Sequence, residues 1–263
     1  MNLTDTSTQL LFTTVPVWAE RADKTVSTGT GFIFNAAISG SPAHAIPFLV
    51  TNHHVVKDAV RGLAEFNERM PDGSPNVEKR VRVEIDQVSL TAFSDAQLDI
   101  AVIPLGPVVN QLESIFRPVF FRAIDPSLLP AKEALNKLAA IENVVFIGYP
   151  SGLRDQKNNM PLVRRGITST PVWNDFEGEA VFLIDAGVFP GSSGSPVFIF
   201  DQGSYASGSD VVIGSRLLFL GMIKESMIAD KTGQFIGIGR VLRSDAIDRF
   251  INSVTAQPQF QRT

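Results

Sequence analysis

The chain has 263 residues and a formal net charge of −4, and 44% of its residues are hydrophobic while 19% are charged. A sizeable core can be buried, so neither general disorder nor an electrostatic attraction to nucleic acid is expected. The lack of cysteine excludes a thiol nucleophile, a thiolate metal site and disulfide bonds. No secretory signal is visible in Met1–Phe12, and no apolar run reaches the roughly 18 residues of a membrane helix, which predicts a soluble, cytoplasmic protein without a membrane partner.

Short runs rich in β-branched and aromatic residues recur along the chain, with turn residues between them. The predicted strands of the first group are Val15–Glu20, Thr30–Asn35, Pro47–Val56, Val81–Phe93 and Asp99–Leu105. Those of the second group are Val144–Pro150, Leu162–Thr168, Ala180–Val188, Ser195–Phe200, Leu217–Ser226 and Phe235–Val241. Many short strands at this spacing favour antiparallel barrels or a sandwich.

Two helical segments are predicted beside these strands. Strong helix formers fill Ala131–Ala140, between the two strand groups. Near the end, Ser244 is a candidate N-cap, and apolar residues follow at helical spacing. Thr255–Thr263 reads as a polar tail, and the Gly- and Ser-rich segment Asp201–Asp210 as the tip of a hairpin.

Three stretches carry residues capable of nucleophilic catalysis. An apolar strand delivers two histidines within Pro47–Val56, an acid precedes a strand in Leu98–Leu105, and a serine lies between glycines in Phe189–Val197. Taken singly, each has a structural explanation, as a surface histidine, a turn or cap residue and a tight turn. Together they place His, Asp and Ser in one chain order, and the same triad geometry occurs in other orders on other folds.

These stretches resemble motifs of the trypsin-like (chymotrypsin-fold) serine peptidases, and more closely those of the bacterial HtrA-like and stand-alone trypsin-2-type branch. Val50–Val56 is similar to the branch's VTNxHVV motif, and Asp99–Val102 to its aspartate motif. Pro190–Pro196 resembles P-G-N-S-G-G-P. The similarity continues through Gly148–Pro150 and Leu220–Ile223, so it covers most of the chain.

The resemblance implies an all-β fold of two six-stranded antiparallel barrels with a C-terminal helix. The expected division is a first barrel over residues 1–115, a connecting segment over 116–140, and a second barrel with the helix over 141–263. The resemblance further implies a serine endopeptidase in which Ser193 attacks, His54 transfers the proton and Asp99 orients the histidine, through an acyl-enzyme intermediate. The backbone N–H groups of Gly191 and Ser193 are expected to form the oxyanion hole.

Other residues in these stretches compete for the same roles. Ser192 is expected to contribute only its amide, and Ser195 to open the next strand. Asp86 belongs to an alternating strand, whereas Asp95, in the turn before Asp99, is the more serious rival. His53 points away from His54 if the strand continues. His44 has no identifiable partner. The chain has only three histidines, one of which is already assigned to catalysis, and no carboxylates group with the others, so no metal site is expected.

Substrate specificity is implied only by motif spacing. The residues expected to contact the substrate are Gly187, Val188, Phe189, Lys224, Glu225 and Ser226. Gly187 falls at the base of the primary pocket and has no carboxylate to pair with Arg or Lys, which favours a small or medium apolar side chain before the cut. Lys224–Ser226 is expected to pair with the substrate as an edge strand, and Glu225 remains an alternative partner for a basic residue.

The sequence also departs from parts of the family. Ser192 replaces the acid that captures a freed N-terminus in digestive enzymes, so activation is not expected to need N-terminal cleavage. Only a helix and a short tail follow the last predicted strand, so no PDZ domain is expected; a regulatory protein partner, an oligomer or a narrow substrate set would then restrain the enzyme. The alternatives are a latent peptide-binding module and an esterase with the same triad. The expected partner is a polypeptide substrate, with no cofactor, no nucleic acid and an unassigned oligomeric state.

Overall fold

The first half of the chain forms one antiparallel sheet in the computed structural model, which describes residues 1–38, 41–208, 210–228 and 235–260. The strand order is β5-β4-β1-β2-β3-β7-β6, and β8 pairs separately with β4. The bounds are β1 Thr14–Arg21, β2 Val26–Ile38, β3 Ser41–Thr51, β4 Ala59–Arg69, β5 Pro75–Asp86, β6 Ser94–Asp95, β7 Ile100–Pro104 and β8 Val119–Phe120.

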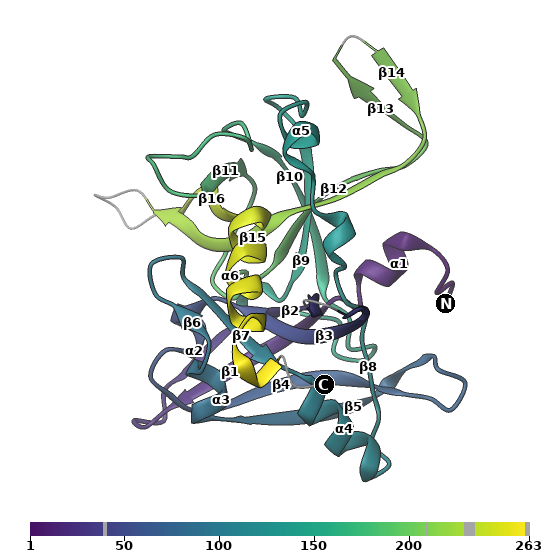
Figure 1. Cartoon of the computed structure of the whole chain (residues 1–263), viewed down its shortest axis with the longest axis vertical. Coiled ribbons are helices and arrows are strands. Elements are labelled where there is room, and N and C mark those ends of the chain that lie inside the picture. Colours follow the sequence, from purple (N-terminus) through teal and green to yellow (C-terminus); the bar gives the residue numbers. More distant parts are fainter. Residues whose placement is uncertain (39–40, 209, 229–234, 261–263) are drawn as a thin grey trace.

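The second half closes into a six-stranded barrel with the order β10-β11-β16-β15-β12-β9. A separate two-stranded hairpin, β13–β14, projects from the barrel between β12 and β15 (Figure 1). The bounds are β9 Asn143–Gly148, β10 Leu162–Thr168, β11 Val181–Asp185, β12 Pro196–Asp201, β13 Ser204–Ser207, β14 Asp210–Ile213, β15 Arg216–Ile228 and β16 Phe235–Arg243.

Helices are short except for the last one, α6, which runs alongside both halves of the molecule (Figure 1). Its residues Ile247, Ile251 and Val254 are buried, as the helical spacing in the sequence predicts. The bounds are α1 Thr6–Leu10, α2 His53–Val56, α3 Gln87–Thr91, α4 Gly106–Ser114, α5 Lys132–Leu135 and α6 Ser244–Thr255, with 3₁₀ turns η1 Pro126–Leu128, η2 Pro150–Gly152 and η3 Pro258–Phe260. None of the helices in the described ranges is long and apolar enough to cross a membrane.

Three clusters of buried apolar side chains stabilise this arrangement. One lies inside each half, and the third joins them, packing Phe32 and Phe48 of the first sheet with Phe198 and Phe219 of the barrel. The α6 residue Ile247 belongs to this joining cluster. The two halves are therefore held together by a shared apolar core, which lets side chains of one half be placed accurately against the other.

The all-β, trypsin-like fold with a C-terminal helix is confirmed, with differences in detail. The first half is an eight-stranded sheet whose end strands, β5 and β6, are connected through α3 instead of being hydrogen-bonded to each other. The strand expected over Val81–Phe93 therefore ends at Asp86, whose carboxylate accepts the N–H of Ser89 and caps α3. The strand β4 was not predicted from the sequence, and the helix expected over Ala131–Ala140 is the single turn α5.

Other boundaries follow the sequence more closely. The strand expected over Leu162–Thr168 coincides with β10, and α6 begins at Ser244, with Arg243 as its cap. The segment Asp201–Asp210, expected to be the tip of a hairpin, contains β13 and the first residue of β14, which form a two-stranded sheet of their own. The connecting segment 116–140 contributes β8 to the first sheet, where it pairs with β4. The division of the chain into two barrels and a connecting segment stays a prediction.

Candidate active site

His54 lies on a short helical turn directly after the strand β3. The strand ends at Thr51, and Asn52 keeps an extended backbone before α2 begins at His53. The buried amide of Asn52 donates from Nδ2 to the backbone oxygen of Asp99, at 2.8 Å. The strand predicted over Pro47–Val56 is therefore wrong for its last five residues, because contacts with the Asp99 segment turn the chain there.

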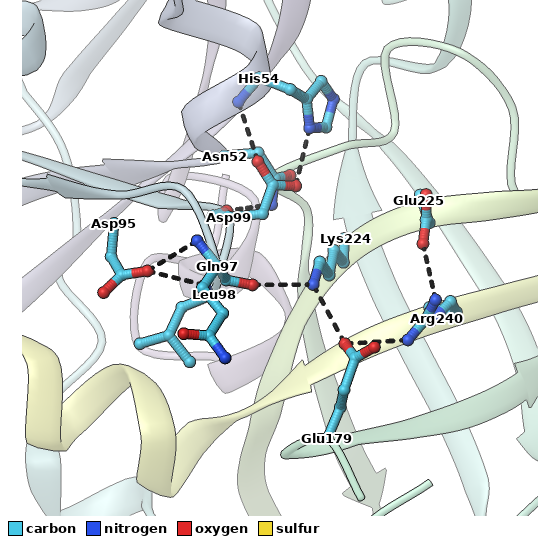
Figure 2. A network of polar contacts seen from close by, with 10 residues as sticks. All are labelled: Asn52, His54, Asp95, Gln97, Leu98, Asp99, Glu179, Lys224, Glu225 and Arg240. Atoms are coloured by element: carbon cyan, nitrogen blue, oxygen red, sulfur yellow. Dashed lines mark hydrogen bonds and ion pairs between the residues drawn. The ribbon is translucent and has the colours of Figure 1, made fainter. Parts of the chain in front are cut away.

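Asp99 is the residue that fixes the position of His54. Its Oδ1 accepts the backbone N–H of His54 at 2.9 Å, and its Oδ2 lies 2.8 Å from the ring Nδ1 (Figure 2). The Asp99 side chain is 12% exposed and the His54 side chain 48%. Because a carboxylate only accepts hydrogen bonds, this arrangement selects, for a neutral imidazole, the tautomer with the proton on Nδ1 and the lone pair on Nε2.

The turn before Asp99 explains why Asp95 does not compete for this role. Asp95 Oδ1 accepts the backbone N–H groups of Gln97 and Leu98, at 2.8 and 2.9 Å, and so closes the turn (Figure 2). Asp99 follows with a positive φ of 60°, a conformation that aspartate tolerates better than most residues. The rival acid thus builds the turn that presents Asp99 to His54.

Ser193 lies in the loop between β11 and β12, which we call the serine loop and define as residues 186–195. It turns through Gly191 and Gly194, with φ values of 85° and 88°, where glycine avoids the strain of a side chain. A Cβ on Gly194 would overlap the backbone oxygen of Thr30. The serine loop thus packs tightly against β2 of the other half.

Thr30 of β2 holds this loop through two of its atoms, the backbone nitrogen and the hydroxyl oxygen. Its N–H donates to the backbone oxygen of Ser193 at 2.8 Å, and its hydroxyl donates to that of Gly191 at 3.0 Å. The same hydroxyl accepts the N–H of Tyr149 at 3.0 Å. The backbone oxygen of Thr30 in turn accepts the hydroxyl of Thr51 at 2.8 Å. The catalytic loop expected from the sequence is thus bound by a residue that the sequence analysis did not single out.

The carbonyls of the serine loop have defined partners that orient its N–H groups. The Pro190 oxygen accepts the N–H of Ser151 at 2.6 Å, and the Ser192 oxygen accepts that of Ser195 at 2.9 Å. In a planar trans peptide the N–H points opposite to the C=O. The N–H groups of Gly191 and Ser193 therefore point away from these partners, and neither finds a hydrogen-bond acceptor within the described part of the chain.

The Val55 side chain, next to His54 in the sequence, and the Ser193 backbone both lie beside Gly29 of β2. A Cβ on Gly29 would lie 2.8 Å from Cγ2 of Val55, the neighbour of His54, and 3.3 Å from the backbone oxygen of Ser193. The described residues contain no hydrogen bond between the Ser193 hydroxyl and the His54 ring. Such bonds are often long without substrate and tighten in the reacting complex.

The competing serines and histidines have other surroundings. Ser192 and Ser195 are each 1% exposed; the Ser192 hydroxyl accepts the N–H of Phe189, and the Ser195 hydroxyl donates to that of Thr30. His53 lies on α2 instead of on the predicted strand, with its Nδ1 buried and without a hydrogen-bond partner among the described residues. The side chain of His44 lies outside the described part of the structure.

The residues expected to form the primary pocket, Gly187, Val188 and Phe189, are at the start of the serine loop. Val188 is buried and packs against Gly239, and its backbone oxygen accepts the hydroxyl of Ser226 at 3.0 Å. The guanidinium of Arg164, on β10, lies where a side chain on Gly187 would go. It also stacks over the ring of Phe189, 5.0 Å from the centroid. A cation that the sequence analysis missed therefore lies beside the expected base of the pocket.

Lys224 and Glu225 belong to a polar network with Gln97, Glu179 and Arg240. Lys224 Nζ lies 3.3 Å from the backbone oxygen of Gln97 and 3.4 Å from the Glu179 carboxylate (Figure 2). Arg240 pairs with both Glu179 and Glu225, at 3.0 and 3.1 Å. Its hydrogen bond is the main reason why the pKa of Glu179 lies below its usual value. Since Arg240 already pairs with Glu225, this carboxylate is a weaker partner for a basic substrate residue.

The strand β15 offers one edge beside this network. Its pairing with β12 covers Arg216–Met222, and Ile223 adds bonds with Gly194 and Ser195. Beyond Ile223, the residues of β15 pair only with β16 among the described strands. Lys224–Ser226 thus has one edge without a strand partner, which fits the expectation of a peptide-pairing edge.

Comparison with known proteins identifies the family of the chain. The family model of the trypsin-like peptidase domain matches residues 29–205, which is more than half of the chain. A search of curated protein sequences found no significant match.

Three solved structures share the fold at low sequence identity. A variant of the HtrA-type protease AlgW with a tripeptide matches at a TM-score of 0.57 and 17% identity, over 98% of this chain and 64% of that one. A second structure of AlgW with a tripeptide matches at 0.56 and 17%, over 95% and 62%. The thermostable serine protease AL20, from an extremophilic microorganism, matches at 0.50 and 13%, over 94% and 99%. This chain thus spans slightly less than two thirds of the length of the AlgW chains.

Proposed function

Because the chain belongs to the family of trypsin-like peptidases, we propose that it is a serine endopeptidase that uses Ser193, His54 and Asp99. The observation that carries the proposal is the double contact of the Asp99 carboxylate with the backbone N–H and the ring Nδ1 of His54. A surface histidine would need neither contact. Together they fix both the place and the tautomer of an imidazole that is half exposed.

Each proposed step moves a proton or a bond through these residues. His54 Nε2 takes the hydroxyl proton of Ser193 as its oxygen attacks the peptide carbonyl, and Asp99 stabilises the imidazolium that forms. The N–H groups of Gly191 and Ser193 bind the developing oxyanion. His54 then gives the proton to the leaving amine, which leaves an acyl-enzyme. A water molecule, activated by the same imidazole, hydrolyses the acyl-enzyme and restores Ser193.

The substrate proposed for this site is an extended polypeptide. Its backbone pairs with the unpaired edge of Lys224–Ser226, and the side chain before the cut faces Gly187, Val188 and Phe189. Arg164 beside Gly187 repels a basic side chain there. A peptide library is therefore expected to return small or medium side chains before the cut and few Lys or Arg residues, whereas enrichment of Lys or Arg would contradict this assignment.

Intact-mass spectrometry after incubation with a fluorophosphonate tests the nucleophile. The wild type is expected to gain one adduct that disappears in Ser193→Ala and persists in the matched neighbour Ser192→Ala. An adduct that survives Ser193→Ala would contradict the assignment. No adduct on folded wild type would favour the latent peptide-binding alternative, in which a protein partner completes the site.

Comparing peptide with ester turnover separates the proposed activity from the esterase alternative. The free edge of β15 pairs with a peptide backbone, which a simple ester lacks. We therefore expect kcat/KM to increase as a peptide substrate is lengthened on the acyl side. A constant kcat/KM with length, together with fast ester hydrolysis, would favour the esterase.

A further inference from the structure

A loop of the second half, residues 149–160, contacts the serine loop directly. It begins with the turn η2, in which Ser151 has a positive φ of 51°. The N–H of Ser151 donates to the Pro190 oxygen at 2.6 Å. The far end of the loop is closed by paired backbone bonds between Asp155 and Met160. This loop therefore fixes the peptide that precedes Gly191.

The same loop is anchored in the first half by two buried polar contacts. Arg154 Nη1 lies 2.9 Å from Oε1 of Glu65, whose side chain is 1% exposed. Asn159 donates from Nδ2 to Oδ1 of Asn67 at 2.6 Å. Glu65 and Asn67 are two residues apart on β4, so they lie on one face of that strand. Arg154 also donates to Oδ1 of Asn159 at 3.2 Å, which joins the two contacts into one cluster.

The cluster is buried enough to be rigid. The Arg154 side chain is 10% exposed, and its guanidinium stacks over the ring of Trp18 at 5.4 Å. Asn159 is 4% exposed and adopts a positive φ of 50°. Separating buried charged and amide groups without giving them new partners is unfavourable. Movement of the loop away from β4 is therefore strongly opposed.

We propose that Arg154 and Asn159 are positioning residues, which hold residues 149–160 so that Ser151 keeps the Pro190–Gly191 peptide in its catalytic orientation. If that peptide rotates, the Gly191 N–H no longer faces the oxyanion. The contacts run from Glu65 and Asn67 through the loop to the Pro190 carbonyl, so the first half controls an element of the second half. This inference rests on the proposed peptidase function.

The test compares two arginines that contact the same carboxylate. Arg82 Nε lies 3.0 Å from Oε2 of Glu65 but belongs to β5, outside the loop. Arg154→Met is expected to lower kcat by about tenfold or more, part of the roughly 10²–10³-fold effect of one oxyanion donor, with KM changed less than twofold. Arg82→Met is expected to change kcat less than twofold, and Arg154→Lys to restore most of the activity. Equal kcat values in Arg154→Met and Arg82→Met would overturn the inference.

A second readout does not depend on activity. Amide hydrogen exchange of Ser151 is expected to be slow in the wild type and in Arg82→Met, and at least tenfold faster in Arg154→Met and Asn159→Ala. Unchanged protection of Ser151 in both loop variants would overturn the inference, even if the wild type proves inactive. Conversely, faster exchange in a chain that cleaves no peptide would reject the proposed function and leave the structural coupling established.

Discussion

The two sides of the site are built in different ways. The histidine side, which consists of His54 and Asp99, is made within the first half, by hydrogen bonds between α2 and the segment before β7. The serine loop belongs to the second half but is held by Thr30 of the first half and by Ser151. The orientation of the base is thus a local property of one sheet, whereas the orientation of the N–H groups depends on how the halves meet.

This difference predicts where substitutions separate the two functions of the site. Changes at the contact between the halves should weaken stabilisation of the oxyanion and leave the His54–Asp99 pair intact. Changes within the Asp99 turn should do the opposite. The variants below are ordered from the largest expected effect to the smallest.

Removal of the base is expected to have the largest effect. His54→Ala should lower kcat/KM about 10⁴-fold or more, since the members of such a triad act as a unit. His53→Ala is the matched control, because the adjacent imidazole makes no hydrogen bond through its buried Nδ1 within the described residues. Steady-state hydrolysis of one peptide measures both. An equal loss in the two variants would show that α2 had been disrupted and that His54 has no special role.

Gly191→Ala is expected to damage the serine loop alone. The new Cβ would lie 2.7 Å from the Tyr149 oxygen and 2.9 Å from the Ser151 nitrogen, at a φ of 85°, so the peptide must move and kcat should fall about 10²–10³-fold. Gly152→Ala is the control, because Gly152 also has a positive φ, of 71°, but open space for a Cβ. Single-turnover kinetics that place the two variants within threefold of each other would contradict this account of the loop.

Thr30→Val tests the contact between the halves. It removes a buried hydroxyl that donates to Gly191 and accepts from Tyr149, which should destabilise the fold by about 1–3 kcal/mol and lower kcat about tenfold. Thr168→Val is matched, because that buried hydroxyl likewise donates to a carbonyl, of Ala140, and accepts an N–H, of Glu142. Urea unfolding should give similar losses of stability. If kcat falls equally in both variants, Thr30 contributes only to the stability of the fold and does not orient the serine loop.

Glu179→Gln should have the smallest effect. Its hydrogen bond with Arg240 lowers the Glu179 pKa below the ordinary 4.5, so the charged pair stabilises the fold above that pH and is lost as the pH falls through the lowered value. The carboxylate is half exposed, so thermal unfolding should show a slight loss of stability at pH 7 that disappears once the pH has fallen through the lowered pKa, with kcat/KM changed less than twofold. A large loss of activity at pH 7 would place the network of Lys224 and Arg240 within the catalytic machinery.

Sequence reasoning could name as candidates only the residues whose motifs are local. His54, Asp99 and Ser193 each stand in a short string with its own pattern, and Asp95 was correctly placed in the turn before Asp99. The end of the strand before His54 was wrong because Val55 and Val56 favour a strand by propensity. The bond from the His54 N–H to Asp99, 45 residues away, stabilises a helical turn there instead.

The residues that hold the serine loop were missed because their partners are distant in the sequence. Thr30 and Gly191 are 161 positions apart, and Asn67 and Asn159 are 92 apart. One signal was available, since Thr30 stands between Gly29 and Gly31 in an apolar strand, and glycine within a strand indicates close approach of another backbone. Arg154 and Arg164 carry no such mark, and their surroundings are visible only in the folded chain.

A crystal structure with a peptide boronate is the most direct test of the central claim, that base and oxyanion donors converge on Ser193. We expect the boron to bond to the Ser193 oxygen, with one boronate oxygen about 2.7–3.1 Å from the N–H groups of both Gly191 and Ser193. His54 should remain bound to Asp99 through Nδ1. An adduct on another side chain, or a boronate oxygen that faces the Pro190 carbonyl in place of the Gly191 N–H, would contradict the account.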